Sequence, residues 1–382
     1  MRYLNIAGYI AIPAAFLVHW LAHDQSWEPI ATFILAALGV IPLAMLMGES
    51  TEHLAERTGP SWGGLLNATF GNAAELIIAL IALHKGLNEV VKASLTGSIL
   101  GNLLLVGGLA MIVGGWRRKE QTFNPFAAET NAGMLALAVA AMLAPAIFHY
   151  TAERMHDPEL TRHEHAVSIG TSIILLATYG LGLLFTLRTH SAIYSHGPRQ
   201  DPSAPRSAHG GHNGYGRWSV GKSVGMLLVA AVAIGIVAEL LVGSAEVLAA
   251  RLGWNHVFVG VILLAVIGNA AEHSTAILMA HRDDMDTAMT ITHQSSLQIA
   301  LFAVPFVVFA SALMGYFGWG HAHMLDLVFS PLEVASVLLT VGIVVVLGLN
   351  GRTNWFEGVL LLALYAILGI AFFNVPVPHT AQ

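Results

Sequence analysis

The string GNAAE occurs twice in the 382-residue chain, at Gly71 to Glu75 and at Gly268 to Glu272, 197 residues apart. Apolar residues surround both copies. A carboxylate inside such a segment is costly to place in hydrocarbon, and by default it marks an ion-binding or proton-transfer site. The two motifs are therefore the starting point for predicting fold and function.

The composition around these motifs is typical of a membrane protein. Apolar residues make up 55% of the chain and charged residues 10%, and the mean hydropathy is +0.68. The net charge of −6 is spread too thinly to form a nucleic-acid-binding face, so we expect no nucleic-acid partner. Cysteine is absent, and there is neither an HExxH metal motif nor a convincing serine and histidine pair. An enzyme is therefore not expected.

Eleven apolar stretches are long enough to cross about 30 Å of hydrocarbon as helices. They cover approximately residues 4–23, 29–48, 62–84, 92–114, 126–148, 167–188, 222–247, 255–280, 288–315, 325–349 and 354–374. The first stretch contains Pro13 and His19 and is not followed by a small-residue cleavage site, so we interpret it as a span rather than a signal peptide. The sequence predicts an all-α membrane protein with eleven transmembrane helices.

The charge distribution predicts the orientation. Eleven spans put twelve basic residues on the side of the N-terminus and five on the other side. The positive-inside rule then places the N-terminus in the cytoplasm and the C-terminus outside. Residues 190–220, rich in His, Gly, Pro and Ser, are expected to form a cytoplasmic linker. This linker separates residues 26–189 from residues 221–382, and residues 1–25 form an additional first helix.

An internal duplication follows from aligning the two GNAAE motifs. The alignment sets GSILGN (97–102) opposite QSSLQI (294–299), and FNPF (123–126) resembles FSPL (329–332) with a small shift. Each repeat then contains five spans. Because five is odd, the two repeats must be inverted with respect to each other. Inverted repeats place equivalent residues on opposing helices near the midplane, as in many secondary transporters.

The residue types in and near the motifs predict a site for a hard cation. Asn72 and Asn269 each precede a glutamate by three residues, so amide and carboxylate are expected on one helical face. Ca²⁺ favours carboxylate, amide and backbone carbonyl oxygens. The alternative for these side chains is interhelical hydrogen bonding and packing. The expected metal site consists of Glu75, Glu272, Asn72, Asn269, Ser98, Asn102, Gln294, Ser295, Gln298, Gly71 and Gly268.

A second set of carboxylates lies in or just after the spans that precede the motifs. Glu49 and Glu52 are three residues apart, and Glu239 and Glu246 are seven apart, so each pair shares a helical face. Burial in a medium of low dielectric favours the neutral form of a carboxyl group, and an incoming Ca²⁺ favours the charged form. We expect Glu52, Glu239, Glu246 and Glu49 to couple transport to protons. The alternative for Glu49 is a solvated helix end.

At these residues the chain closely resembles the calcium/proton antiporters of the cation exchanger family, within the calcium/cation antiporter superfamily. GGLLNATFGNAAELIIALIAL (Gly63 to Leu83), VVKASLTGSILGNLLLVGG (Val90 to Gly108) and VIGNAAEHSTAI (Val266 to Ile277) look like its two signature regions and their continuation. The resemblance implies one additional first helix plus two inverted five-helix repeats, with Ca²⁺ bound between the third and eighth spans. Glu75 and Glu272 match the central acids. Ca²⁺ is then the transported substrate, and no cofactor is expected.

The sequence therefore predicts a secondary active antiporter that exchanges Ca²⁺ for H⁺ by alternating access, with carboxylates that bind the two ions competitively. The alternative is a Na⁺, K⁺ or Mn²⁺/H⁺ antiporter of the same fold, and a passive channel is a further alternative. The expected partners are Ca²⁺, H⁺ and the lipid bilayer. We expect an integral, multi-pass protein of a prokaryotic inner membrane, and the oligomeric state stays open.

Overall fold

Long helices form nearly all of the regular structure. A computed structural model describes residues 2–22, 25–58, 63, 66, 69–190, 218–320, 323–348 and 350–376. The helices before the predicted linker are α1 (Arg2–Leu21), α2 (Glu28–Thr58), α4 (Ala73–His84), α5 (Asn88–Leu100), α6 (Gly107–Gly115), α7 (Pro125–Arg154) and α8 (Leu160–Leu184). Those after it are α10 (Val220–Leu252), α11 (His256–Phe258), α12 (Ala265–Gly268), α13 (Ala270–His281), α14 (Met285–Gln298), α15 (Val304–Phe317), α16 (Pro331–Gly348) and α17 (Trp355–Phe373).

Short π-helical segments continue four of these helices. They are η1 (Gly101–Val106), η2 (Phe185–Thr189), η3 (Val259–Leu264) and η4 (Ile299–Ala303). In α5–η1–α6, and likewise in α14–η4–α15, one continuous span therefore consists of three segments. π-Helical turns often occur at functional sites. Here η1 contains the predicted ligand Asn102, and η4 begins directly after the predicted ligand Gln298.

Length and apolar composition support a multi-pass membrane protein. Among the described residues, eight helical stretches could cross a membrane, and a ninth results if the bent pair His256–Gly268 and Ala270–His281 is one span. Ile6–Leu21 and Ala73–His84 are shorter apolar helices. Leu228, Val232 and Ile236 recur every four residues along α10 and are exposed, as expected of a face toward lipid. The helical membrane fold is confirmed, whereas the count of eleven crossings stays a prediction.

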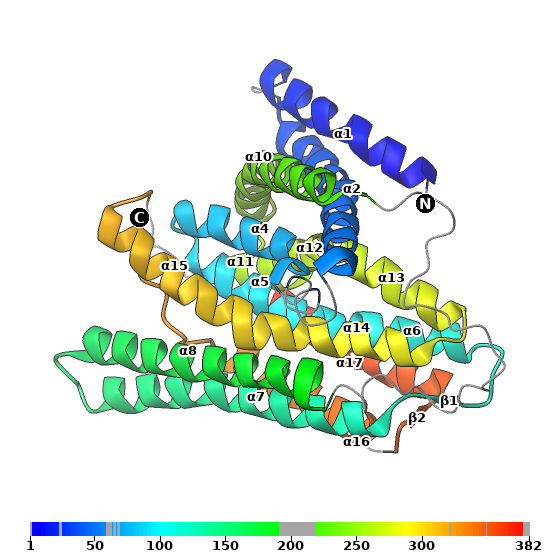
Figure 1. The fold of residues 1–382 in the computed structure, drawn as a ribbon. Coiled ribbons are helices and arrows are strands. Elements are labelled where there is room, and N and C mark those ends of the chain that lie inside the picture. The colour runs from blue at the N-terminus through cyan, green and yellow to red at the C-terminus, as the bar shows by residue number, and fades with distance from the viewer. Residues whose placement is uncertain are drawn as a thin grey trace.

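The GNAAE motifs lie between two groups of helices. Figure 1 shows α1, α2 and α10 together at one side and the α7–α8 hairpin at the opposite side, with α4, α5, α12 and α14 between them. Within this middle group α5 crosses η3 at very short range. A Cβ atom added to Gly97 would lie 2.1 Å from the carbonyl oxygen of Val261, so only glycine allows this approach of the two backbones.

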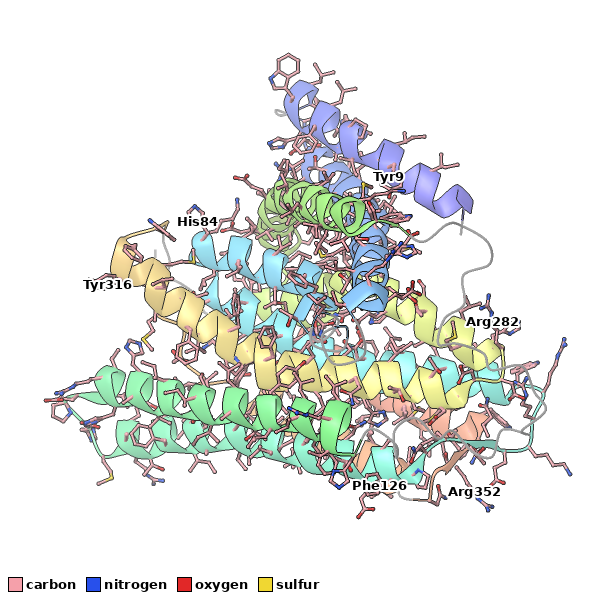
Figure 2. All side chains as sticks on the ribbon, in the orientation of Figure 1. Tyr9, His84, Phe126, Arg282, Tyr316 and Arg352 are labelled. Carbon is pink, nitrogen blue, oxygen red and sulfur yellow. The ribbon has the colours of Figure 1, made fainter. Side chains whose placement is uncertain are left out.

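Loops that the charge distribution assigns to one side of the membrane lie at one end of the bundle. Arg118 forms an ion pair with Asp283, Nε to Oδ1 2.8 Å, between the loops after α6 and α13. At this end β1 (Gln121–Thr122) and β2 (Arg352–Thr353) pair antiparallel. Figure 2 shows Arg282 and Arg352 at this end and His84 at the opposite end. The predicted linker falls almost entirely on residues 191–217, which lie outside the described ranges.

Candidate cation-binding site

Both GNAAE motifs interrupt a helix, which corrects the expectation of continuous helices through them. Residues 71 and 72 form a turn before α4, and the helix axis bends by 61° between Gly268 and Ala270. Asn72 and Asn269 are the N-cap residues of α4 and α13. Gly and Asn have low helix propensity, which explains the break at these positions. Interrupted helices with exposed ends form the ion sites of many transporters.

The two glutamates occupy equivalent positions at these helix starts. Glu75 lies in the first turn of α4, and Glu272 lies in the first turn of α13. Unpaired N–H groups and the helix dipole make the start of a helix favourable for a negative charge. The helix N-termini thus help to stabilise two carboxylates that the surrounding apolar residues would otherwise disfavour.

Each motif asparagine contacts a serine in the other half of the chain. Among the described contacts, neither makes a side-chain cap of its own helix. Asn72 donates to the Ser295 carbonyl at 3.3 Å and accepts from Ser295 Oγ at 3.2 Å. Asn269 donates to Ser98 Oγ at 2.8 Å. Ser98 and Ser295 occupy aligned positions in the sequence, so the two contacts are reciprocal between the two halves of the chain.

Asn102 connects the two asparagine–serine pairs. Its amide donates to Asn269 Oδ1 at 3.3 Å and to Ser295 Oγ at 2.8 Å. The side chains of Asn72, Asn102 and Asn269 are at most 1% exposed. Buried polar groups in such a network are held in defined positions because each depends on its neighbours for hydrogen bonds. The network therefore provides a fixed frame for the two carboxylates.

The two carboxylates lie close to each other in this frame. Glu75 is 8% exposed and Glu272 is partly buried, and the two groups are near enough to repel each other electrostatically. Ser295 interacts with the Glu272 carboxyl group. Gly268 leaves room for the first glutamate, because an added Cβ there would lie 3.2 Å from Glu75 Cγ. The glycine of the second GNAAE motif thus leaves space for the glutamate of the first.

Each glutamate keeps one oxygen without a described partner. The Oε2 atoms of Glu75 and Glu272 are buried and have no hydrogen-bond donor among the described residues. Two neighbouring carboxylates that each have a buried, unpaired oxygen require a proton or a cation for compensation. Among the described residues, no group of three or more His, Cys, Asp and Glu side chains is arranged to hold a metal ion, so amide and hydroxyl groups would supply the further oxygen ligands.

The remaining predicted ligands lie nearby but are engaged differently. Gln294 donates to Asn131 Oδ1 of α7 at 3.2 Å, so its amide nitrogen is bound to α7. Gln298 is 7% exposed, and its Nε2 has no described partner. Gly71 belongs to the turn before Asn72. The role of all these residues as cation ligands stays a prediction.

The carboxylates predicted to carry protons lie at the surface. Glu49, Glu52, Glu239 and Glu246 on α2 and α10 are all exposed. Burial by protein therefore does not provide the medium of low dielectric that the sequence predicts around them. The reason is that α2 and α10 pack against each other through their apolar residues, which leaves these acids on other faces of the two helices. Their role in proton coupling stays a prediction.

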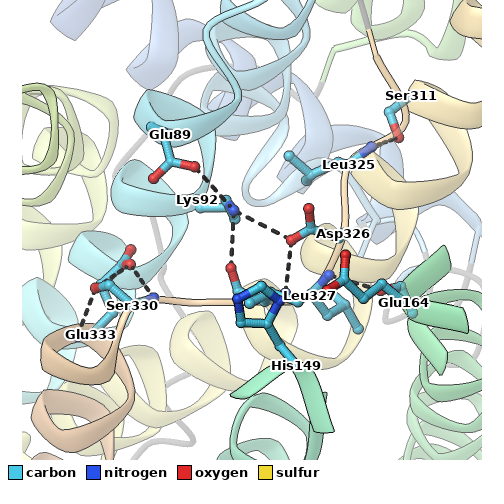
Figure 3. Close-up of polar contacts among 12 residues, drawn as sticks. Glu89, Lys92, His149, Glu164, Ser311, Leu325, Asp326, Leu327, Ser330 and Glu333 are labelled. Atoms are coloured by element: carbon cyan, nitrogen blue, oxygen red, sulfur yellow. Dashed lines mark hydrogen bonds and ion pairs between the residues drawn. The ribbon is translucent and has the colours of Figure 1, made fainter. Parts of the chain in front are cut away.

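A buried polar cluster near the site was not assigned from the sequence. Lys92 of α5 donates to Asp326 Oδ1 at 3.3 Å and to the Val328 carbonyl at 2.9 Å (Figure 3). Glu333 of α16 is 1% exposed and accepts a hydrogen bond from Thr96 Oγ1 at 3.3 Å. The S-x-x-E pattern of SPLE (330–333) signals a helix start, but nothing in it indicates the contact with α5.

Interrupted helices, paired carboxylates and an apolar multi-helix bundle together define the class of secondary transporters for ions. The family model described as sodium/calcium exchanger protein matches residues 28–188 and 222–374, and the chain belongs to this family. It is 44% identical to a Ca(2+)/H(+) antiporter of Synechocystis sp. over 95% of both chains. It is 37% identical to the Ca(2+)/H(+) antiporter ChaA of Bacillus subtilis, over 97% of this chain and 99% of the relative.

Solved structures agree with this assignment. Native YfkE superposes with a TM-score of 0.77 at 34% identity, covering 97% of this chain and all of that one. The H⁺/Ca²⁺ exchanger CAX has a TM-score of 0.63 over 97% of this chain and 92% of its own. Because its sequence identity is only 12%, that second likeness concerns the fold alone.

Proposed function

We propose that the chain is a secondary active antiporter that exchanges Ca²⁺ for H⁺ across a membrane. The observation that carries the proposal is the pair Glu75 and Glu272, which repel each other electrostatically and whose buried Oε2 atoms have no hydrogen-bond partner among the described residues. Membership of the sodium/calcium exchanger family and the names of the Synechocystis and Bacillus relatives support Ca²⁺ and H⁺ as the transported ions.

Competition between the two ions provides the coupling. Two neighbouring carboxylates that are shielded from water cannot both remain charged without a counter-ion, so the site holds either protons or a divalent cation. Ca²⁺ entry displaces protons from Glu75 and Glu272, and protonation releases Ca²⁺ on the other side. Asn72, Asn269, Ser98, Asn102 and Ser295 supply further oxygens, and Gln294, Gln298, Gly71 and Gly268 complete the proposed site. Glu49, Glu52, Glu239 and Glu246 are proposed to exchange protons between the site and water.

The proposed topology has eleven crossings, with an additional first helix and two inverted five-helix repeats. Eight long stretches, one bent pair and two shorter apolar helices correspond one to one to the eleven apolar stretches of the sequence. The reciprocal pairs Asn72–Ser295 and Asn269–Ser98 support inversion of the repeats. The proposed units are residues 1–25, 26–189, the linker 190–220 and 221–382.

The proposed location is the plasma membrane of a prokaryote, with the N-terminus in the cytoplasm. The excess of basic residues on one side supports this orientation. The clustering of Arg118, Arg282 and Arg352 at one end of the bundle agrees with it. Bacterial relatives in Bacillus and Synechocystis support the membrane assignment.

Inverted membrane vesicles test the proposed function. Respiration or ATP hydrolysis imposes a pH gradient, and a pH-sensitive dye reports its dissipation when a cation is added. We expect Ca²⁺ to dissipate the gradient with the wild type and not with Glu75→Gln or Glu272→Gln, both inserted at wild-type levels. Parallel additions of Mn²⁺, Na⁺ and K⁺ define selectivity. Ca²⁺-driven proton flux that persists in both variants would overturn the assignment of the two acids.

A further inference from the structure

Glu333 is a buried carboxylate with more partners than helix capping requires. Its Oε2 accepts hydrogen bonds from the Ser330 backbone N–H at 2.9 Å and from Ser330 Oγ at 2.7 Å. Ser330 Oγ in turn accepts from the Glu333 backbone N–H at 3.3 Å, which completes a capping box at the start of α16. The other oxygen, Oε1, accepts from Thr96 Oγ1 of α5 at 3.3 Å (Figure 3).

A second capping box in the same protein shows what capping alone needs. At the start of α17, Glu357 accepts from the Asn354 backbone N–H at 3.3 Å, and Asn354 accepts from the Glu357 backbone N–H at 3.2 Å. Among the described residues, the hydrogen bonds of Glu357 all lie within its own cap. The contact of Glu333 with α5 is therefore additional to its capping role.

The segment that carries Glu333 is held rigidly. Leu325 and Leu327, in the loop between α15 and α16, are each 1% exposed. The backbone N–H of Leu325 donates to Ser311 Oγ at 2.8 Å, and that of Leu327 donates to Ser168 Oγ at 2.9 Å. A buried loop needs such partners for its backbone groups, and α15 and α8 supply them. Glu333 thus follows a buried loop that is hydrogen-bonded to α15 and α8.

The contact with α5 lies close to the proposed site. Thr96 precedes Ser98 by two residues, and Ser98 accepts the hydrogen bond of Asn269. Lys92, one turn earlier on α5, is bound to the same loop through the Val328 carbonyl. The loop therefore holds α5 at two successive turns just before the residues that contact the second repeat.

We propose that Glu333 is a positioning residue of the cation site and acts through Thr96 by fixing the rotation of α5 about its axis. The inference rests on the proposed function. A helix rotation of about 15° would displace a side-chain oxygen about 4 Å from the axis by about 1 Å. A displacement of that size in a ligand frame is large enough to weaken binding strongly. Ser98 and Asn102 are the side chains that such a rotation would misplace.

Thr96→Val is the sharpest test, because it removes one hydroxyl group and leaves the α16 capping box intact. The measurement is the initial rate of exchange against Ca²⁺ concentration in inverted vesicles. Loss of a hydrogen-bond partner that orients metal ligands typically lowers metal affinity or activity by roughly 10–100-fold. We therefore expect the apparent KM for Ca²⁺ to rise about tenfold, with a maximal rate within about twofold of wild type. Thr96→Ser retains the hydroxyl group and should restore the wild-type KM.

Thr340→Val is the matched control. Thr340 is fully buried in α16, and its Oγ1 has no described hydrogen-bond partner, so the same substitution there should leave the KM unchanged. If Thr96→Val fails to insert in the membrane, a comparison of Glu333→Ala with Glu357→Ala repeats the test. Both variants remove a capping glutamate, but only Glu333 contacts α5. In a double-mutant cycle, Thr96→Val and Glu333→Ala should be non-additive in the KM.

Three outcomes would overturn the inference: a wild-type KM in Thr96→Val, equal effects of Thr96→Val and Thr96→Ser, or additive effects of Thr96→Val and Glu333→Ala. The wild type in the same vesicles separates this inference from the proposed function. If the wild type does not exchange Ca²⁺ for protons, the proposed function fails. If it does and Thr96→Val behaves normally, only the positioning role fails.

Discussion

The crossing of α5 with η3 makes Gly97→Ala the substitution with the most clearly defined structural cost. An added Cβ would lie 2.1 Å from the carbonyl oxygen of Val261 and 2.5 Å from its Cα atom. To reach the 3.4 Å at which ordinary contact begins, the two backbones must separate by about 1.3 Å. Overpacked cores typically lose about 1–3 kcal/mol, and contact with backbone rather than a movable side chain favours the upper end of that range.

Gly101→Ala is the matched control, one helical turn further along the same span. Nothing lies within 4 Å of a Cβ atom added there. Alanine is favoured over glycine in a helix by about 1 kcal/mol, so this variant should be neutral or slightly stabilised. Thermal unfolding in detergent, followed by tryptophan fluorescence, should show a lower midpoint for Gly97→Ala and not for Gly101→Ala. Equal midpoints would refute the close crossing of the two backbones.

Three further predictions follow from single contacts. Ser295→Ala should reduce Ca²⁺ affinity more than Ser98→Ala, because Ser295 Oγ bonds two asparagines and contacts Glu272; equal losses in a ⁴⁵Ca²⁺ binding assay would contradict this. Asn354→Ala removes the cap of α17 and should cost about 1 kcal/mol of stability, measured as a lower unfolding midpoint. The hydrogen bond from His163 lowers the pKa of the exposed Asp157 carboxyl group below its ordinary value. The stabilisation that this contact provides is therefore present at a pH above the ordinary pKa, and it is lost as the pH falls through the lowered pKa. NMR titration should find the pKa of Asp157 closer to the ordinary value in His163→Ala, and an unchanged pKa would contradict the contact.

The helices and the central motifs are predictable from the sequence because both signals are local. Apolar length identifies a membrane helix without tertiary information. The repeat of GNAAE, together with the alignment of Ser98 with Ser295, was sufficient to predict that the two halves meet at these residues. The structure brings them together through Asn72–Ser295 and Asn269–Ser98 hydrogen bonds. Sequence identity with antiporter relatives supports the function predicted from the same residues.

Other features depend on tertiary contacts and were not predictable. The helix breaks at Asn72 and Asn269 lack proline, the strongest sequence signal for a break, and the low helix propensity of Gly and Asn favours a break without requiring one. The exposure of Glu239 could not be inferred from its apolar neighbours, because burial depends on which helix face meets a partner. The bond between Glu333 and Thr96 joins positions 237 residues apart, and local patterns do not report such pairs.

Proton release from the purified protein tests the central claim most directly. Ca²⁺ is added to the wild type in weakly buffered detergent solution near neutral pH, and released protons are measured against bound ⁴⁵Ca²⁺. If Glu75 and Glu272 bind the two ions competitively, the wild type releases protons in proportion to the Ca²⁺ bound, and Glu75→Gln and Glu272→Gln lose most of both signals. Ca²⁺ binding without proton release, or wild-type release in both variants, would contradict the account.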